Sequence, residues 1–183
     1  NFHNLAMRFA QLEQAIAEDA VGRLAACQPL VAECLSAKDL ADELQSCTDK
    51  LPVRVCHNDT KINNMLYSDA QQAGIAAIDL DTCMPGYWLF DFGDMVRTCC
   101  SPEPEDILRP ELVVIRPEIF KALAQGYLQG LGDGITEAEK QSLLLGAKVM
   151  CLMIGVRFLT DYLNGDRYFA VHRPHHNLQR AEN

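Results

Sequence analysis

Apolar side chains recur every three or four residues along most of this chain, the spacing typical of amphipathic helices. The pattern predicts helices over residues 5–27, 29–47, 88–96, 117–131 and 136–163. The last of these begins with Thr136 and Glu139, whose spacing is that of a capping box, in which each side chain bonds the backbone N–H of the other residue. The tail beyond residue 163 is polar, with helical character expected at its end.

Three short runs rich in β-branched and other apolar residues predict strands between the second and third helices. They cover Val53–Cys56, Met65–Tyr67 and Ile75–Ile78, and the polar stretch between the last two predicts a hairpin. Together the elements indicate an α+β protein that is mostly α. With 183 residues, of which 49% are hydrophobic, the chain is expected to form one domain over residues 1–183.

The charge of the chain disfavours some classes of partner. A formal net charge of −9 argues against binding to nucleic acid or to an anionic membrane. The apolar stretch Leu143–Leu159 is interrupted by Lys148 and Arg157, so it predicts a core helix rather than a membrane span.

The eight cysteines include no C-x-x-C pair. Because the chain is too long for a small disulfide-stapled scaffold, they are expected to be buried free thiols of a cytoplasmic protein. Three histidines near the end, His172, His175 and His176, lack the thiol or carboxylate spacing of a metal site. We expect them on a solvated surface.

The segment from His57 to Asn64 carries the most specific chemistry. It reads His-x-Asp-x-Lys-x-x-Asn and directly follows the strand predicted at Val53–Cys56. Phosphoryl transfer depends on positioning and charge neutralisation, so Asp59 would face the acceptor hydroxyl and Lys61 would approach the transferring phosphoryl group. Asn64 offers an amide oxygen to Mg²⁺, and His57 is expected to brace the loop.

A second carboxylate completes the expected magnesium site. Asp79 ends the third predicted strand, 20 residues after Asp59, and Mg²⁺ prefers such oxygen ligands. The tripeptide Asp91-Phe92-Gly93 spells a kinase metal-binding motif literally, yet it follows no hairpin strand. Asp91 is therefore expected to cap the next helix or to brace the catalytic loop. For Asp81, contact with metal or substrate and orientation of the Asp79 loop all stay open.

These residues resemble those of the aminoglycoside phosphotransferase and choline kinase superfamily, whose members have a protein-kinase-like fold. The stretches VCHNDTKINNMLY and AAIDLDTCMPGYWLFDFGDMVR carry this resemblance, and GVRFLTDYLNGDRYF is similar to the bacterial N-acetylhexosamine 1-kinases. The resemblance covers residues 2–180. It implies ATP as phosphoryl donor, Mg²⁺ as cofactor, and the anomeric hydroxyl of an N-acetylhexosamine as acceptor.

By this resemblance Asp59 is the catalytic base, Asn64 and Asp79 are the Mg²⁺ ligands, and Arg157 and Tyr168 belong to the sugar-side wall. An arginine inside an apolar helical run is unusual, which fits a side chain that faces a cleft. Two plainer interpretations stay open: Arg157 could pair with Asp161, four residues on, and Tyr168 could serve packing alone.

One departure from the family pattern narrows the expectation. The family has an N-terminal lobe with a loop that covers the nucleotide and a strand lysine that grips its phosphates, and nothing in residues 1–183 resembles either. The chain is therefore expected to be the C-terminal lobe, inactive as an isolated fragment. Apolar surface that the missing lobe would cover would favour self-association into a homo-oligomer. Two other functions stay open: phosphorylation of an aminoglycoside- or choline-like alcohol, and a non-catalytic binding lobe.

Overall fold

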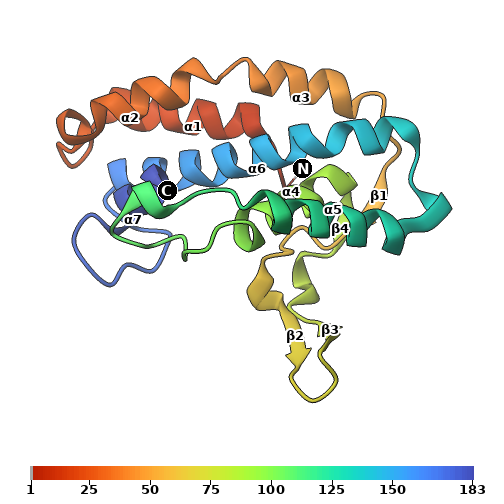
Figure 1. Ribbon diagram of the computed structural model, residues 1–183. Helices are drawn as coiled ribbons and strands as arrows, with labels where there is room; N and C mark the ends of the chain where they lie inside the picture. Colours follow the sequence, from red (N-terminus) through yellow and green to blue (C-terminus); the bar gives the residue numbers. More distant parts are fainter. Residues whose placement is uncertain (1) are drawn as a thin grey trace.

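The computed structural model describes residues 2–183, and one long helix, α6 (Glu137–Leu163), runs through the centre of the fold (Figure 1). Most of the other helices pack directly on it. On one side of α6 lie α1 (Leu5–Glu18), α2 (Leu24–Ser36) and α3 (Leu40–Thr48), and on the other lie α4 (Trp88–Cys99) and, beyond it, α5 (Pro117–Leu131). The short α7 (His176–Glu182) packs against α6 near the end of the chain.

The strands form two separate antiparallel pairs. Strand β1 (Arg54–Cys56) pairs with β4 (Met84–Gly86), whereas β2 (Met65–Ser68) pairs with β3 (Ala73–Ala77). The β2–β3 hairpin projects away from the helical body, and all five residues of β3 are exposed (Figure 1). The chain between β1 and β2, which holds the predicted catalytic loop, therefore lies where the hairpin leaves the helices.

Helix α6 carries the core because its apolar side chains bury against helices on both sides. Met150, Met153 and Leu159 are each at most 1% exposed and belong to the main hydrophobic cluster, which α1 joins through Phe9 and Leu12. By length and composition α6 could cross a membrane, but half of its most apolar window is buried inside the protein. This burial agrees with the core helix that its two charged residues predict.

Two glycines let α4 and α6 approach closely. A Cβ atom on Gly93 would lie 2.2 Å from the carbonyl oxygen of Gly146, and one on Gly146 would lie 2.1 Å from that of Leu89. No side chain fits at either position, since such contacts lie far inside the van der Waals limit. Helix packing thus explains Gly93, the last residue of the tripeptide that resembles a kinase metal motif.

The predicted mostly helical α+β class, the β2–β3 hairpin and the capping box of Thr136 and Glu139 are confirmed. The continuous helix predicted over residues 5–27 is wrong. It ends at Glu18 because Asp19 takes a left-handed conformation (φ 36°), and the Asp19 carboxylate then accepts hydrogen bonds from the backbone N–H groups of Arg23 and Leu24 at the start of α2.

Other predicted boundaries also change. Pro29 lies inside α2 instead of opening a helix, and the second predicted helix divides into α2 and α3. Strand β4 was not predicted. All eight cysteines are free, but Cys83 and Cys151 are exposed rather than buried. His176, expected on the surface, is fully buried with its Nε2 atom 3.3 Å from the Asp106 carboxylate.

Candidate active site

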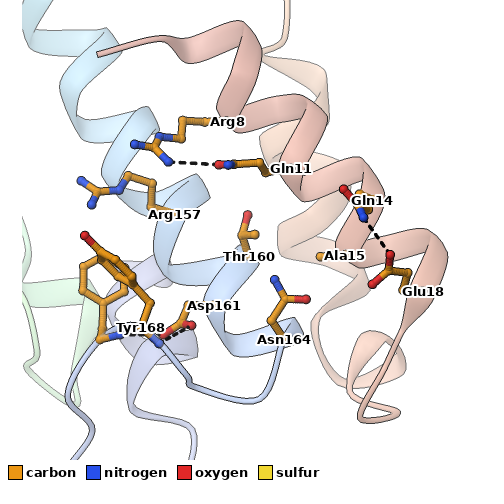
Figure 2. A pocket seen from close by; sticks show the side chains of 11 residues that line it. Arg8, Gln11, Gln14, Ala15, Glu18, Arg157, Thr160, Asp161, Asn164 and Tyr168 are labelled. Carbon is orange, nitrogen blue, oxygen red and sulfur yellow. Dashed lines mark hydrogen bonds between the residues drawn. The ribbon is translucent and has the colours of Figure 1, made fainter. Parts of the chain in front are cut away.

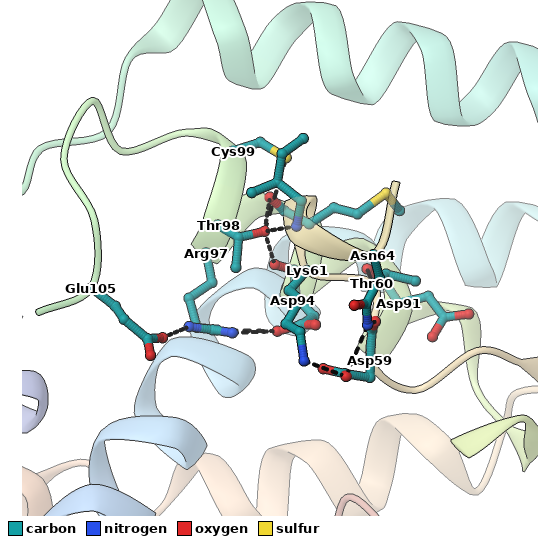
Figure 3. Close-up of polar contacts among 12 residues, drawn as sticks. Asp59, Thr60, Lys61, Asn64, Asp91, Asp94, Arg97, Thr98, Cys99 and Glu105 are labelled. Atoms are coloured by element: carbon teal, nitrogen blue, oxygen red, sulfur yellow. Dashed lines mark hydrogen bonds and ion pairs between the residues drawn. The ribbon is translucent and has the colours of Figure 1, made fainter. Parts of the chain in front are cut away.

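The loop between β1 and η1 (Ile62–Asn64) is fixed to α4 by one buried carboxylate (Figure 3). Asp91 accepts hydrogen bonds from the backbone N–H groups of His57 (2.9 Å) and Asn58 (2.8 Å). Its own carbonyl oxygen accepts one from the Thr60 hydroxyl (2.6 Å). Burial raises the pKa of Asp91, while the two N–H donors act in the opposite direction by stabilising the charged form. Asp91 therefore braces the loop, and its carboxylate is already occupied.

Two threonines, which the sequence did not single out, hold the loop at further points. The hydroxyl of Thr98 on α4 accepts a hydrogen bond from the backbone N–H of Ile62 (3.1 Å). The hydroxyl of Thr82 donates to the His57 carbonyl (2.7 Å), and the Thr82 carbonyl accepts from the Asn58 side chain (3.1 Å). Asn58 needs such support, since its φ of 64° lies in the left-handed region.

His57 connects the loop to the end of β3. Its Nε2 donates to the carbonyl of Ile78 (2.9 Å), and its Nδ1 accepts from the backbone N–H of Asp59 (3.3 Å). This pair of contacts assigns the tautomer with the proton on Nε2. His57 thus spans the two segments that carry Asp59 and Asp79, and its ring nitrogens are both in use.

The carboxylate of Asp59 is held on one oxygen only. Its Oδ2 accepts from the ammonium of Lys61 (2.7 Å) and from the side-chain amide of Asn64 (2.9 Å), which also donates to the Asp59 carbonyl (2.8 Å). Within residues 2–183 no protein group donates to Oδ1. That oxygen is left free to accept a hydrogen bond from another group.

Asp79 lies next to this group but is less firmly held. Its Oδ2 is 4.0 Å from the Lys61 ammonium, its φ is 65°, and about half of its side chain is exposed (45%). Hydrogen bonding with Asp81 and the negative charge of that residue raise the pKa of Asp79. Two carboxylates in contact repel one another, so a cation bound between them would stabilise this arrangement.

The oxygen atoms present fit a magnesium ion. The amide oxygen of Asn64 and the carboxylate of Asp79 are hard ligands, and the backbone N–H of Ile78 donates to the Asn64 carbonyl (2.9 Å), which ties the two segments together. The described residues 2–183 contain no cluster of three or more His, Cys, Asp or Glu side chains that could hold a metal alone. Magnesium sites with few protein ligands are the kind in which substrate phosphates complete the coordination shell.

A second buried carboxylate on α4 belongs to Asp94, which the sequence did not single out. Asp94 is 3% exposed and pairs with Arg97 (3.0 Å), which also reaches Glu105 (2.7 Å). Burial raises the pKa of Asp94, whereas the Arg97 charge lowers it. The Asp94 carboxylate lies within electrostatic reach of Lys61. Figure 3 shows Arg97 with its two acidic partners, Asp94 and Glu105.

The two predicted sugar-side residues lie in a groove of about 430 Å³ between α1 and α6 (Figure 2). The Arg157 guanidinium is 5.8 Å from the ring centre of Tyr168 and 5.3 Å from that of Phe169. Tyr168 is 74% exposed, so its ring does not serve packing alone. The alternative pairing of Arg157 with Asp161 is wrong.

Asp161 is instead occupied by the segment that follows α6. Its two oxygens accept hydrogen bonds from three backbone N–H groups, those of Arg167 (3.0 Å), Tyr168 (2.9 Å) and Phe169 (3.0 Å). The Asn177 side chain donates to the same carboxylate (2.9 Å). Asp161 therefore shapes the aromatic wall of the groove and leaves Arg157 without a carboxylate partner.

Comparison with known protein families identifies the family of the chain. A family model described as "Phosphotransferase enzyme family" (APH) matches residues 1–139, which is most of the chain and includes the whole catalytic loop, Asp79 and α4. The matched stretch stops within the start of α6, so the groove residues of α6 and beyond lie outside it. The chain belongs to this phosphotransferase enzyme family and has its kinase-like fold.

Proposed function

We propose that this chain is the catalytic lobe of an ATP-dependent sugar kinase, with the anomeric hydroxyl of an N-acetylhexosamine as acceptor. Membership of the phosphotransferase family supports the class of reaction. The observation that carries the proposal is the loop geometry, in which Asp59 has one free carboxylate oxygen beside Lys61 and Asn64.

In the proposed mechanism Asp59 accepts the proton of the acceptor hydroxyl through Oδ1 as that oxygen attacks the γ-phosphoryl group. Lys61 holds the other oxygen of Asp59 and so orients the carboxylate, and its ammonium offsets negative charge near the transfer path. Side-chain hydrogen bonding to Asp59 raises the pKa of Lys61, which keeps it charged across the neutral range.

We infer that Asn64 and Asp79 hold Mg²⁺ and that Asp81 assists Asp79. The ion would supply charge neutralisation for the donor phosphates, which is the main requirement of phosphoryl transfer. The contact between Asp79 and Asp81 supports this assignment, because the repulsion that raises the pKa of Asp79 is relieved when a cation binds.

A sugar fits the groove between α1 and α6 better than a cationic acceptor does. The groove carries two arginines without a carboxylate partner, Arg8 and Arg157, which would repel a polycationic aminoglycoside or a quaternary amine. Its two carboxylates already accept hydrogen bonds, Glu18 from Gln14 and Asp161 from three backbone N–H groups. The single Trp88, which a choline cage would need, already stacks on the Arg54 guanidinium at 4.4 Å. Amide, hydroxyl and guanidinium groups line the groove instead, as expected for binding of sugar hydroxyls: Gln11, Gln14, Thr160, Asn164 and Tyr168.

A second cavity supports an alternative acceptor. It measures about 550 Å³, borders Lys61 on the catalytic loop, and is lined largely by apolar side chains: Val96, Val113, Ile115, Ile154 and Phe158. An alcohol with an apolar body would suit it. Such an acceptor would require no contact with Arg157, which separates the two alternatives experimentally.

The proposal also includes a partner lobe and a location. Apolar residues that the β2–β3 region leaves exposed, among them Met65 (47%), Leu66 (44%) and Ile75 (55%), offer a surface for an N-terminal lobe that would complete the nucleotide site. We propose a cytoplasmic protein, because the free thiols suit a reducing compartment.

A panel of acceptors tests the function. The chain, expressed together with the proposed N-terminal lobe, is incubated with MgATP and with N-acetylhexosamines, other hexoses, aminoglycosides and choline, and phosphorylated products are identified by ³¹P NMR. We expect an anomeric phosphate on an N-acetylhexosamine, with the acceptor KM raised about tenfold by Arg157→Gln. Turnover of another alcohol only, unaffected by Arg157→Gln, would favour the apolar cavity, and no turnover would leave a non-catalytic lobe.

A further inference from the structure

The groove between α1 and α6 contains an arginine that the sequence did not single out. Arg8 reaches into the groove from α1 and Arg157 from α6, and Figure 2 shows their side chains extending in the same direction. The Nη1 atom of Arg8 donates to the side-chain oxygen of Gln11 (3.0 Å). Two separate elements therefore bring two guanidinium groups to one end of the groove.

These two arginines differ from most others in the chain because they have no acidic partner. Five arginines form ion pairs with carboxylates within 4.0 Å, namely Arg23, Arg54, Arg97, Arg173 and Arg180. Within residues 2–183 neither Arg8 nor Arg157 forms such a pair. The Nε atom of Arg8 is buried and has no hydrogen-bond partner among the described residues.

An unpaired, partly buried guanidinium is unfavourable in the free protein. A buried donor without an acceptor loses its hydrogen bonds to water and forms no protein hydrogen bond in their place. Burial and the charge of Arg157 both lower the pKa of Arg8, which reflects this cost. A ligand that brings oxygen acceptors into the groove would satisfy the free donors and spread the two positive charges.

His3 links the arginine end of the groove to α4, the helix that holds the catalytic loop through Asp91. His3, which is 4% exposed and stacks on Phe90 at 4.7 Å, is within electrostatic reach of Arg8, Arg157 and Asp59. Burial lowers the pKa of His3 to about 4, so the imidazole stays neutral and adds no third positive charge. His3 thus interacts electrostatically with both arginines and with the proposed base Asp59.

We propose that Arg8 is a specificity-determining residue that pairs with Arg157 to bind two neighbouring oxygen atoms on the acceptor edge opposite the phosphorylated hydroxyl. This inference rests on the proposed function, because it takes a polyhydroxylated sugar as the acceptor. Arginine suits the task, since its planar fork offers several donors in fixed directions. Gln11 holds one of those donors and so fixes the fork toward the groove.

Steady-state kinetics with Arg8→Gln, measured in the chain expressed with the proposed N-terminal lobe, test the proposal. The acceptor KM should rise about tenfold while the KM for ATP stays within about twofold, because one acceptor-specific contact is lost. Arg8→Lys keeps the positive charge but not the planar guanidinium, so its acceptor KM should lie between those of the wild type and of Arg8→Gln. Arg109→Gln, on an exposed arginine outside both cavities, is the matched control and should leave both constants unchanged.

A series of deoxy sugars shows whether the contact is direct. The wild-type enzyme should discriminate against acceptors that lack a hydroxyl at one of two adjacent positions, and Arg8→Gln should reduce that discrimination about tenfold at those positions only. Equal discrimination in both enzymes, or an equal rise of the acceptor and ATP constants, would overturn the role of Arg8 while the sugar kinase assignment stands. If the wild-type enzyme phosphorylates no sugar, both proposals fail together.

Discussion

The two carboxylates proposed for phosphoryl transfer are supported very differently. On the Asp59 side, Asp91, Thr82 and Thr98 fix the catalytic loop through backbone hydrogen bonds between 2.7 and 3.1 Å, and Asn64 and Lys61 hold the carboxylate itself. On the Asp79 side, the carboxylate is exposed and meets another carboxylate.

The difference suggests which half is preformed. The fold of this chain supplies the contacts that orient the proposed base, so that half needs no ligand to take its shape. The Asp79 half has unbalanced negative charge and few protein contacts, so a cation would complete it. Substitutions on the Asp59 side should therefore lower activity by disturbing the geometry of the loop. Substitutions on the Asp79 side should instead change the magnesium requirement.

Apart from loss of Asp59 itself, the largest effect on this contrast is expected from Asp79→Asn. Removal of the carboxylate should lower kcat/KM for MgATP about 100-fold, because one charged metal ligand is lost, while thermal stability changes little at this exposed position. Magnesium titrations of the rate measure the shift in metal requirement. Asp133→Asn, an exposed control, should behave as wild type, and an Asp79 variant with unchanged magnesium dependence would place the metal elsewhere.

Asp81→Asn in the same titrations resolves the role of that residue. Without the neighbouring charge the pKa of Asp79 should fall, so the acidic limb of the rate profile should move to lower pH. A change in the magnesium dependence would assign Asp81 to the metal, and a change in the acceptor KM alone would assign it to the substrate.

A smaller loss of activity, joined to a loss of stability, is expected from Asp91→Asn. The amide would present an N–H group to one of two backbone donors, those of His57 and Asn58, and leave that donor unpaired in a buried position. We expect a loss of about 2 kcal/mol in unfolding free energy and about tenfold in kcat, with the magnesium requirement unchanged. Urea denaturation and magnesium titration measure the two effects.

The matched control is Asp69→Asn in the exposed hairpin turn, which should change neither quantity. A shifted magnesium requirement in Asp91→Asn would contradict the assignment of Asp91 as a brace. It would return the literal Asp91-Phe92-Gly93 tripeptide to a metal-binding role.

The smallest effect concerns the anchor of β1, the strand that leads into the catalytic loop. Glu139 accepts two hydrogen bonds from Arg54 (2.8 and 2.9 Å), and these, together with two from Thr136, lower its pKa from 4.5 to about 2. A depressed pKa contributes stability above pH 4.5 that is lost as the pH falls toward 2. Glu139→Gln should therefore cost about 2 kcal/mol at pH 7, with a difference from wild type that narrows below pH 4.5.

Urea denaturation at several pH values between 7 and 3 measures this dependence. Glu137→Gln, two residues away and exposed, provides the control. A difference that stays constant with pH would mean that the Arg54 contact acts through shape rather than charge.

The sequence was most informative where function depends on neighbours along the chain. His57, Asp59, Lys61 and Asn64 lie within one loop, so their spacing alone indicated a shared site. The choice of Asp91 as a brace followed from local context, since no hairpin precedes it. Its Phe92 and Gly93 could not be interpreted in the same way, because their roles in the core and in helix crossing depend on distant α5 and α6.

Features formed by segments far apart in the chain were missed. Strand β4 has only three residues, one of them a proline, and exists because β1 lies beside it. Thr98 and Arg8 carry no distinguishing local pattern, since one is a helical threonine and the other an arginine on an amphipathic helix. The structure gives them roles by placing Ile62 and Arg157 beside them.

The most direct test of the account is single-turnover transfer from saturating MgATP to the acceptor, in wild type and in Asp59→Asn. With its only free proton acceptor removed, Asp59→Asn should transfer the γ-phosphoryl group about 10³-fold more slowly, while its affinity for MgATP stays the same. Transfer at the wild-type rate in Asp59→Asn would contradict the account, because the preformed half of the site would then contribute nothing to the chemistry.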